Sequence, residues 1–326
     1  MARGNILVSG EAFSAEVAEE LRAEGFEVRQ HTDFAPEAEL IELLRGKDAY
    51  VMAGDESITP KVAASLSGLK VIAFFGVGPE TFFLGDALAQ VTEKGIPVTI
   101  TPGANNQAVA EMTLALIFDL LRKTTHLNNS VKRGEWHQFT AGELKDKTLG
   151  IVGLGRIGST VAEALVKGFG ARCVYFGRER KEELERELGL RFLSLEELLE
   201  TSDIVTLHAI LSDETRHMLS EQELGRLRPG SLLVNTARAE LVEPTALRGA
   251  LGSGRLGAAA FDGYYVEPAD PVTDPHGLLA LPDDVFLVTP HQAFNTQEAN
   301  VKASRMVADA VRSELGGEAY RFRANL

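Results

Sequence analysis

The chain has 326 residues, of which 44% are hydrophobic and 25% are charged, and its formal net charge is −14. This length and composition predict a globular protein with two domains, each large enough to bury a hydrophobic core. The acidic balance argues against nucleic acid and anionic membranes as partners, because both are bound mainly through basic surface. An anionic substrate would have to meet a local cluster of positive charge.

Cysteine usage and hydropathy predict a location in the cytoplasm. Cys173 is the only cysteine, so no intramolecular disulfide can form and a reducing compartment is permitted. The first residues lack an apolar signal segment, and no run approaches the roughly 18 apolar residues that a membrane helix needs. We therefore expect neither a membrane location nor secretion.

The first part of the chain alternates short apolar runs with amphipathic stretches, which predicts an α/β unit. Helical periodicity covers Glu16–Glu24 and Pro60–Leu66. A turn then leads into a long hydrophobic helix, Gln107–Arg122, which we expect to be buried between two domains. The predicted strands are Asn5–Val8, Ala49–Ala53, Lys70–Phe75 and Pro97–Ile100.

A glycine-rich loop follows the predicted strand that begins near Thr148. Its glycines, Gly153, Gly155 and Gly158, have the spacing of a dinucleotide-binding loop, and a helix starting near Arg156 follows. The first glycine allows a tight turn, the second lets the backbone approach a pyrophosphate, and the third lets helix and strand pack closely. Strand, loop and helix in this order predict a nucleotide site at the helix N-terminus.

Strands and helices continue to alternate beyond this loop, as in a doubly wound nucleotide domain. A last helix, about Thr296–Leu315, is expected to return to the first domain. The predicted fold is α/β with two doubly wound parallel sheets, in which a Rossmann nucleotide domain (102–293) is inserted into a flavodoxin-like domain (1–101 plus 294–326). The nucleotide domain should have six strands, near Gly150, Cys173, Ile204, Leu232, Ala258 and Phe286.

Three polar residues stand where predicted strands of the nucleotide domain meet their following loops, the sheet edge at which ligands bind. Arg238 and His291 each end an apolar run, and Glu267 follows one by a short loop. Interconversion of 2-oxo and 2-hydroxy acids uses these residue types. Arginine binds a carboxylate with a planar fork, histidine exchanges the proton, and glutamate orients the histidine. Taken alone, each residue is equally compatible with a role in a loop, a surface ion pair or a turn.

The motifs, in their order along nearly the whole chain, resemble those of the D-isomer-specific 2-hydroxyacid dehydrogenases. They are Pro102–Asn105 with Val109–Glu111, Gly153–Gly158, Asp203–His208, Asn235–Arg238, Asp262 with Glu267, and Thr289–His291. The resemblance implies that Arg238 anchors the substrate and that Glu267 and His291 form the acid/base pair. It also implies a substrate-binding domain built from both chain ends, and a homodimer.

The same resemblance implies residues around substrate and cofactor. The backbone N–H groups of Val77 and Gly78 would hold the substrate carboxylate, and Asp262 would contact the nicotinamide carboxamide. His208 should form a wall of the cofactor site and donate no proton. Cofactor contacts are expected from Gly153, Gly155, Arg156, Ile157, Gly158, Arg178, Arg180, His208, Ala237 and Asp262. No metal is expected, because no cluster has metal-ligand spacing, and His126 is predicted at the surface.

Three features depart from the family pattern. The segment Pro79–Gly85 is longer than usual and carries two phenylalanines, Ala239 stands where the family has glycine, and Gly263–Tyr265 replaces an aliphatic and aromatic pair. Phe82 and Phe83 could cover the substrate site, or they could only pack the helix that begins there.

The end of the second nucleotide strand distinguishes NAD from NADP. NAD-specific folds place a carboxylate there, about 20 residues beyond the glycine loop, for the ribose 2′-hydroxyl. Here Gly177 lies 19 positions beyond Gly158 and is followed by Arg178. Arg178, with Arg180 nearby, could bind a 2′-phosphate, or this charged run could only begin a solvated helix. We predict NADP as the cofactor, with NAD as the second choice.

The predicted reaction is NADPH-dependent reduction of a small 2-oxo acid, of the glyoxylate or hydroxypyruvate type, to the D-2-hydroxy acid. An alternative is an NAD-dependent D-lactate or phosphoglycerate dehydrogenase. Phenylalanines in the pocket loop argue against a phosphorylated substrate, whereas Pro290–Phe294 is similar to D-lactate enzymes. A nucleotide-sensing binding protein on the same fold is the alternative of another class, and the presence of all three catalytic residue types argues against it.

Overall fold

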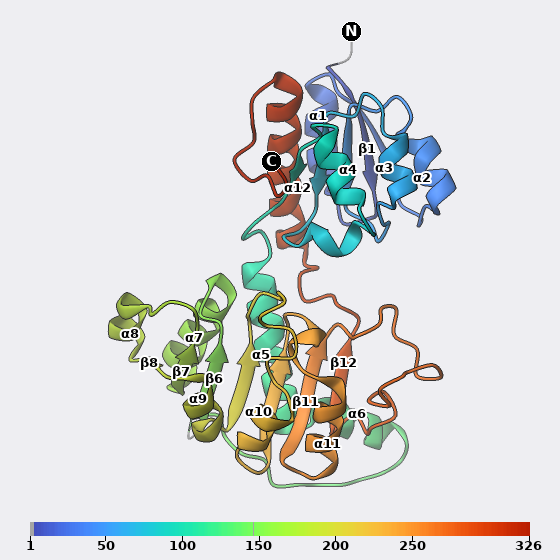
Figure 1. Cartoon of the computed structure of the whole chain (residues 1–326). Coiled ribbons are helices and arrows are strands. Elements are labelled where there is room, and N and C mark those ends of the chain that lie inside the picture. Colours follow the sequence, from blue (N-terminus) through green and yellow to red (C-terminus); the bar gives the residue numbers. More distant parts are fainter. Residues whose placement is uncertain (1–2, 146) are drawn as a thin grey trace. The chain divides into compact units, whose positions relative to one another are not determined.

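A computed structural model describes residues 3–145 and 147–326. The chain forms two compact units, Met1–Asn105 with Asn295–Leu326, and Asn106–Phe294. Each unit contains one parallel sheet, of five strands in the first and seven in the second, with helices packed on it (Figure 1). The predicted fold class of two parallel-sheet α/β domains is therefore confirmed.

The first unit has the sheet order β2-β1-β3-β4-β5. Its core has two parts, one formed with α2, α3 and α4 and the other with α1 and α12. Strand β2 was not predicted, because this edge strand, EVRQH, has too few apolar residues to produce a clear pattern. The elements are β1 (Asn5–Ser9), α1 (Ala15–Ala23), β2 (Glu27–His31), α2 (Glu37–Leu44), β3 (Ala49–Met52), α3 (Pro60–Ser65), β4 (Val71–Phe74), η1 (Pro79–Phe82), α4 (Ala87–Glu93), β5 (Val98–Thr99) and α12 (Gln297–Gly316).

The end of the chain covers the edge of this sheet at β5. The Ala324 N–H donates to the Val98 carbonyl, and the Ile100 N–H donates to the Phe322 carbonyl. An antiparallel bridge joins Thr99 to Arg323. An uncovered edge strand would present unpaired backbone groups to other chains, so the C-terminal tail protects this edge.

The structure assigns a packing role to the phenylalanines after β4. Phe83 is 5% exposed and belongs to the core of the first unit. Phe82 packs against the same core, with its ring 5.2 Å from the ring of Phe74. The hypothesis that both rings cover the substrate site is therefore wrong for Phe83 and has no support from the position of Phe82.

The second unit has the sheet order β12-β11-β10-β9-β6-β7-β8. It has seven strands where six were predicted, because β8 is only two residues long and has no readable periodicity. The elements are α5 (Asn106–Arg122), α6 (Thr124–Lys132), β6 (Thr148–Val152), α7 (Arg156–Phe169), β7 (Arg172–Phe176), α8 (Glu182–Leu188), β8 (Arg191–Phe192), α9 (Leu195–Thr201), β9 (Ile204–Leu207), α10 (Glu221–Arg226), β10 (Ser231–Asn235), η2 (Ala239–Leu241), α11 (Pro244–Gly252), β11 (Leu256–Asp262) and β12 (Phe286–Thr289).

Helix α5 belongs to the second unit. It packs on α7, β10 and β11, and Ala110, Leu116 and Ile117 lie in the core on that side. The predicted burial of this helix is therefore found against the second sheet. Its hydrophobicity reflects burial against that sheet.

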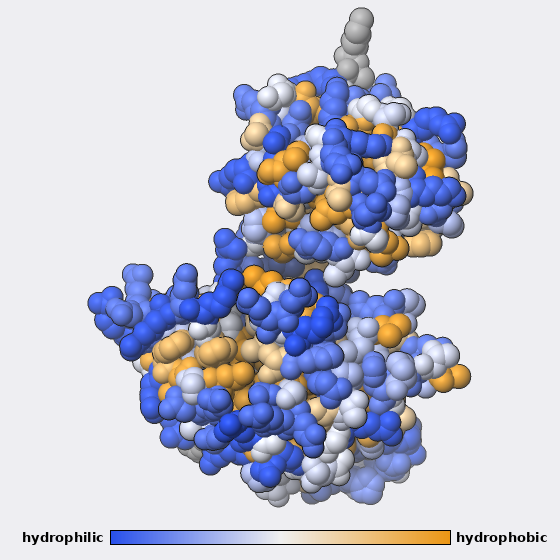
Figure 2. All heavy atoms as spheres, in the orientation of Figure 1, coloured by the Kyte–Doolittle hydropathy of each residue, from blue (hydrophilic) through white to orange (hydrophobic). Residues whose placement is uncertain are grey.

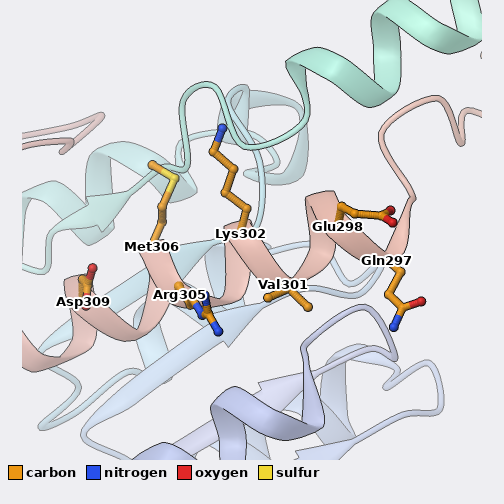
Figure 3. A pocket seen from close by; sticks show the side chains of 7 residues that line it. All are labelled: Gln297, Glu298, Val301, Lys302, Arg305, Met306 and Asp309. Atoms are coloured by element: carbon orange, nitrogen blue, oxygen red, sulfur yellow. The ribbon is translucent and has the colours of Figure 1, made fainter.

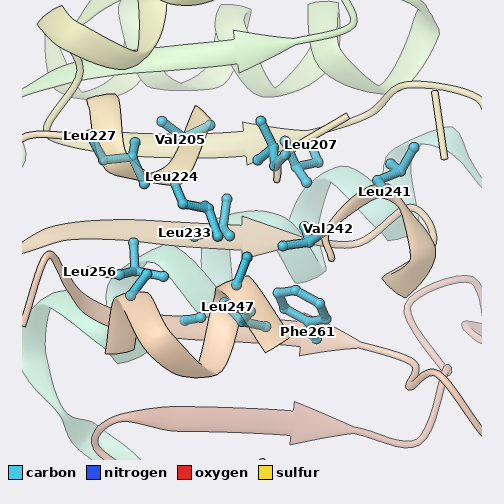
Figure 4. Packing of buried hydrophobic residues seen from close by; sticks show 14 of the residues in the cluster. Val205, Leu207, Leu224, Leu227, Leu233, Leu241, Val242, Leu247, Leu256 and Phe261 are labelled. Carbon is cyan, nitrogen blue, oxygen red and sulfur yellow. The ribbon is translucent and has the colours of Figure 1, made fainter. Parts of the chain in front are cut away.

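Another core cluster of the second unit aligns the strands that lead to the site. Val205, Leu233 and Phe261 lie on β9, β10 and β11, and they pack together with Leu224 and Leu247 of α10 and α11 (Figure 4). The parallel register places Asn235 beside Leu207 and Phe261, and Asp262 beside Thr289. The carboxyl ends of four strands therefore lie side by side at one sheet edge.

The surface of both units is largely hydrophilic in the view of Figure 2, with scattered hydrophobic residues. Among the described residues, no helix combines the length and the hydrophobicity that crossing a membrane requires.

Candidate active site

The glycine loop has the geometry that its spacing predicts. Gly153 has φ +98°, and a Cβ there would lie 2.7 Å from the backbone carbon of His208. Gly158 packs against the Gly153 carbonyl, where a side chain would clash. Gly155, directly before α7, has nothing within 4 Å of its would-be Cβ. The loop is tight where it meets the sheet and open at the helix N-terminus, where backbone N–H groups can face a phosphate.

The first residues of α7 complete this loop. Arg156 is exposed, and Ile157 packs partly against the core. Backbone hydrogen bonds join this loop to the neighbouring strands. The Gly153 N–H donates to the Phe176 carbonyl, and the His208 N–H donates to the Val152 carbonyl, each over 2.8 Å. The ends of β6, β7 and β9 are therefore held together around the loop.

His208 follows β9 and has both ring nitrogens buried without a hydrogen-bond partner among the described residues. Burial lowers its pKa to about 4, so the imidazole is neutral at pH 7. A buried polar group without a partner is costly. The unpartnered nitrogens therefore favour a ligand or water beside this ring.

The charged run after β7 divides into paired and unpaired residues. Arg180 binds Glu185 through Nε and Nη2, with distances of 2.9 and 2.8 Å, and Lys181 binds Glu179 at 3.0 Å. Arg178 is exposed and forms no hydrogen bond or ion pair within the described ranges. Of the two arginines predicted beside a 2′-phosphate, Arg178 and Arg180, only Arg178 thus has its guanidinium free of such a partner in the described part of the chain.

Arg238, His291 and Glu267 form a connected row at the sheet edge. Glu267 Oε2 lies 3.0 Å from His291 Nδ1, and Arg238 Nη1 lies 3.4 Å from His291 Nε2. When Nδ1 donates to Glu267, Nε2 is the nitrogen that remains to exchange a proton. The structure brings together three residues that lie far apart in the sequence.

The backbone around Arg238 is fixed by Asn235, a 1% exposed residue at the end of β10. Its amide nitrogen donates to the Arg238 carbonyl over 2.8 Å, and its amide oxygen accepts the Ala237 N–H over 3.0 Å. The Ala237 carbonyl in turn accepts Arg238 Nη1 at 2.9 Å. Asn235 was predicted only as part of a motif, although a polar residue at the end of the apolar run LLVN was a usable signal for this role.

Asp262 is 4% exposed and organises the turn that carries His291. Its Oδ1 accepts the Thr289 hydroxyl at 2.6 Å and the Gln292 N–H at 3.0 Å, and its Oδ2 accepts the Ala293 N–H at 2.7 Å. His291 has φ +49°, a conformation that non-glycine residues rarely adopt. The three bonds on both sides of His291 hold it there.

Electrostatics at Glu267 favour the carboxylate form. Burial raises its pKa, but hydrogen bonds from His291 and from the Tyr264 N–H, together with the positive charge of Arg238, outweigh burial and lower the pKa below its ordinary value. Glu267 is therefore ionised at neutral pH. A carboxylate at this place stabilises a positively charged His291 ring.

The predicted substrate loop lies in the first unit, after β4. Val77 has 49% of its surface exposed, and Gly78 directly precedes η1. Both therefore lie in an accessible loop at the carboxyl end of the sheet.

Among the described residues, one group of side chains has the distances of a metal site, namely His126, Asp283 and Asp284. His126 Nδ1 lies 2.6 Å from Asp283, and Lys123 lies 2.7 Å from Asp284. The lysine ammonium already neutralises one carboxylate, so these contacts explain the cluster as an ion-pair anchor for α6. His126 keeps 29% of its side chain exposed in this anchor, beside Asp283.

A hollow of about 600 Å³ lies along α12 in the first unit (Figure 3). Lys302 extends from the helix and donates to the Gly103 carbonyl over 2.8 Å. None of the predicted site residues lines this hollow, so we do not assign the reaction to it. Its lining residues are Gln297, Glu298, Val301, Lys302, Arg305, Met306 and Asp309.

Comparison with known proteins identifies the family. The sequence model of the D-isomer specific 2-hydroxyacid dehydrogenase NAD binding domain matches residues 114–293. The glyoxylate reductase of Aeropyrum pernix is 37% identical over 320 residues, which cover 95% of this chain and 92% of that protein. The chain belongs to the D-isomer specific 2-hydroxyacid dehydrogenase family. The predicted resemblance and enzyme class are thus confirmed.

The chain is also similar to other dehydrogenases and to solved structures. The D-3-phosphoglycerate dehydrogenase of Methanocaldococcus jannaschii is 35% identical over 86% of this chain, but the match covers 52% of that protein. The TT0316 protein of Thermus thermophilus superposes with a TM-score of 0.84 at 33% identity, covering 98% of this chain and 99% of that one. A D-lactate dehydrogenase of Treponema pallidum has a TM-score of 0.83 at 26% identity, covering 99% of this chain and all of that one.

The dehydrogenase uses a nicotinamide cofactor, because the matched domain is an NAD-binding domain. The residues present fit such a group. The open backbone at Gly155 leaves room for a pyrophosphate, and the buried ring nitrogens of His208 lack partners among the described residues. The nicotinamide ring, when bound, carries the hydride.

Proposed function

We propose that this dehydrogenase reduces a small 2-oxo acid of the glyoxylate or hydroxypyruvate type with NADPH, giving the D-2-hydroxy acid. The observation that carries the proposal is the row formed by Arg238, His291 and Glu267. A substrate whose carboxylate binds Arg238 places its carbonyl oxygen within reach of His291 Nε2. The glyoxylate reductases among the relatives support a small substrate.

In this proposal each residue has one task. Arg238 binds the substrate carboxylate and polarises the carbonyl. His291 holds a proton on Nε2 and transfers it to the carbonyl oxygen, and Glu267 stabilises the charged ring through Nδ1. Val77 and Gly78 supply backbone N–H groups for the substrate carboxylate. In the oxidative direction, neutral His291 accepts the proton instead.

The cofactor preference in the proposal is NADP, and it rests on Gly177 and Arg178. Position 177 has no carboxylate, and the Arg178 guanidinium is free to bind a phosphate. We also propose a homodimer, as the family resemblance implies, and a location in the cytoplasm, which the single cysteine permits.

A substrate panel tests the proposed reaction. The purified enzyme is assayed by loss of reduced cofactor with glyoxylate, hydroxypyruvate, pyruvate and phosphohydroxypyruvate, each with NADPH and NADH. We expect the highest kcat/KM for glyoxylate or hydroxypyruvate with NADPH. A preference for pyruvate or phosphohydroxypyruvate would support the alternative dehydrogenases instead. Nucleotide binding without turnover on any substrate would support the binding-protein alternative.

Arg238→Lys tests the substrate anchor. Lysine keeps the charge but loses the planar fork, so we expect kcat/KM for the 2-oxo acid to fall at least about tenfold, about 1.4 kcal/mol. The matched control is Arg228→Lys, since Arg228 is an exposed arginine of the same unit that pairs with Asp203. If both variants match the parent on every substrate, the anchor is not Arg238.

A further inference from the structure

The loop that carries Glu267 contains a second polar pair, Tyr264 and Asp274. Tyr264 is 6% exposed, and its hydroxyl donates to Asp274 Oδ1 over 2.7 Å. Asp274 also accepts the N–H groups of His276 and Leu279, each at 3.0 Å. Asp274 therefore joins the Tyr264 side chain to the turn formed by residues 274–279.

Asp274 is the charged member of this pair. Burial raises its pKa, but hydrogen bonds from the Leu279 N–H, the Tyr264 hydroxyl and the His276 N–H outweigh burial and lower it. The carboxylate is ionised at neutral pH, which makes the bond from the Tyr264 hydroxyl charge-assisted and strong.

The backbone of Tyr264 contacts Glu267. Its N–H donates to Glu267 Oε1 over 2.8 Å, while Oε2 faces His291 Nδ1. Gly263 permits this approach, because it has φ +101° and a Cβ there would lie 2.7 Å from Glu267 Oε1. Each carboxylate oxygen of Glu267 thus has one partner. The bond from the Tyr264 N–H to Oε1 therefore fixes the orientation of the carboxylate plane in which Oε2 faces His291 Nδ1.

Glu267 needs such a restraint because 43% of its side chain is exposed. A partly solvated glutamate has several accessible rotamers, and holding it in one costs conformational entropy. The ring of Tyr264 is held independently of Glu267, with centroids 5.4 Å from Tyr265 and 6.3 Å from Phe286. The donor that fixes Glu267 is therefore anchored in the core.

We propose that Tyr264 and Asp274 are positioning residues that hold Glu267, and through it the His291 ring, in the orientation for proton exchange. The inference rests on the proposed function of His291 as proton donor. Neither the Tyr264 hydroxyl nor Asp274 contacts His291 or Arg238, so their effect on the reaction passes through Glu267.

The charges around His291 determine the sign of the expected effect. Glu267 faces Nδ1 and favours the protonated ring, Arg238 faces Nε2 and disfavours it, and Asp262 lies beneath the turn with its oxygens bound to residues 289, 292 and 293. When Glu267 is less constrained, its carboxylate offsets less of the repulsion between Arg238 and a protonated His291 ring. His291 should then lose its proton at lower pH.

Tyr264→Phe tests the proposal, and Tyr265→Phe is the matched control. The two tyrosines are neighbours, but the Tyr265 hydroxyl donates to the Val242 carbonyl over 2.9 Å and does not reach Asp274. The full chain is labelled with ¹³C-histidine, and the His291 ring is followed by NMR through a pH titration. Its signal is assigned by its absence in His291→Ala. This readout needs neither cofactor nor turnover.

We expect Tyr264→Phe to move the His291 titration midpoint down by about half a pH unit or more, and Tyr265→Phe to leave it within about 0.1 unit. The high-pH limb of kcat/KM for reduction should move in the same direction, with KM for the cofactor unchanged. Asp274→Asn removes the charge at similar size and should shift the midpoint in the same direction.

Equal midpoints in Tyr264→Phe and Tyr265→Phe would overturn the inference, and if Asp274→Asn does not fold, the tyrosine pair alone decides. Failure of the proposed function has a different signature. In that case the midpoints differ as expected, but the parent enzyme turns over no 2-oxo acid.

Discussion

Replacing His291 with alanine should lower turnover of the 2-oxo acid by about two to four orders of magnitude, the usual contribution of a positioned general acid. Nε2 of this ring, beside Arg238, is the nitrogen that exchanges the proton in the proposal, since Nδ1 is engaged by Glu267. Binding of the reduced cofactor, measured by fluorescence titration, should remain nearly unchanged. The rate of the parent enzyme in the reductive direction should fall as pH rises, because reduction uses the protonated ring.

Two further variants make this result specific. His291 has φ +49°, and asparagine tolerates that conformation better than alanine, so His291→Asn should be as inactive with less disturbance of the turn. His137→Ala removes an exposed histidine of the same unit and should retain full activity. Near-normal turnover in both His291 variants would remove this residue from the mechanism.

Exchanging the residues after β7 should reverse the cofactor preference. Gly177→Asp with Arg178→Ala adds an acceptor for the ribose 2′-hydroxyl and removes the partner of a 2′-phosphate. If each change is worth about 1.5 kcal/mol, the ratio of kcat/KM with NADPH to that with NADH should fall about a hundredfold or more. The new side chain fits, because the nearest atoms to a Cβ at position 177 are 3.8 Å away.

Arg180→Ala is the matched control for this exchange. Its guanidinium is bound to Glu185, so its removal should leave the cofactor ratio close to that of the parent. A parent enzyme that prefers NADH tenfold or more, about 1.4 kcal/mol, would contradict the NADP assignment. If replacing Arg180 changed the cofactor ratio and replacing Arg178 did not, the phosphate contact would have been assigned to the wrong arginine.

The nucleotide loop and the strand-end residues could be predicted because their signals are local. The spacing of Gly153, Gly155 and Gly158 follows from backbone geometry within one turn, and the structure has that geometry. Arg238 and His291 follow apolar strands, and parallel strands deliver such residues to one sheet edge. Edge strands β2 and β8 were missed because one is polar and the other has two residues.

The two α/β units, the nucleotide loop and the residue types at the sheet edge are encoded locally, because periodicity and backbone sterics act over a few residues. Which side chains meet depends instead on how distant segments pack. Arg180 is bound by Glu185, Phe83 is buried in the core, and Tyr264 is joined to Asp274. These contacts depend on how a loop packs or on which of several nearby charged residues forms an ion pair. Neighbouring residues with the same charge, or neighbouring aromatic residues, cannot be distinguished from the sequence alone.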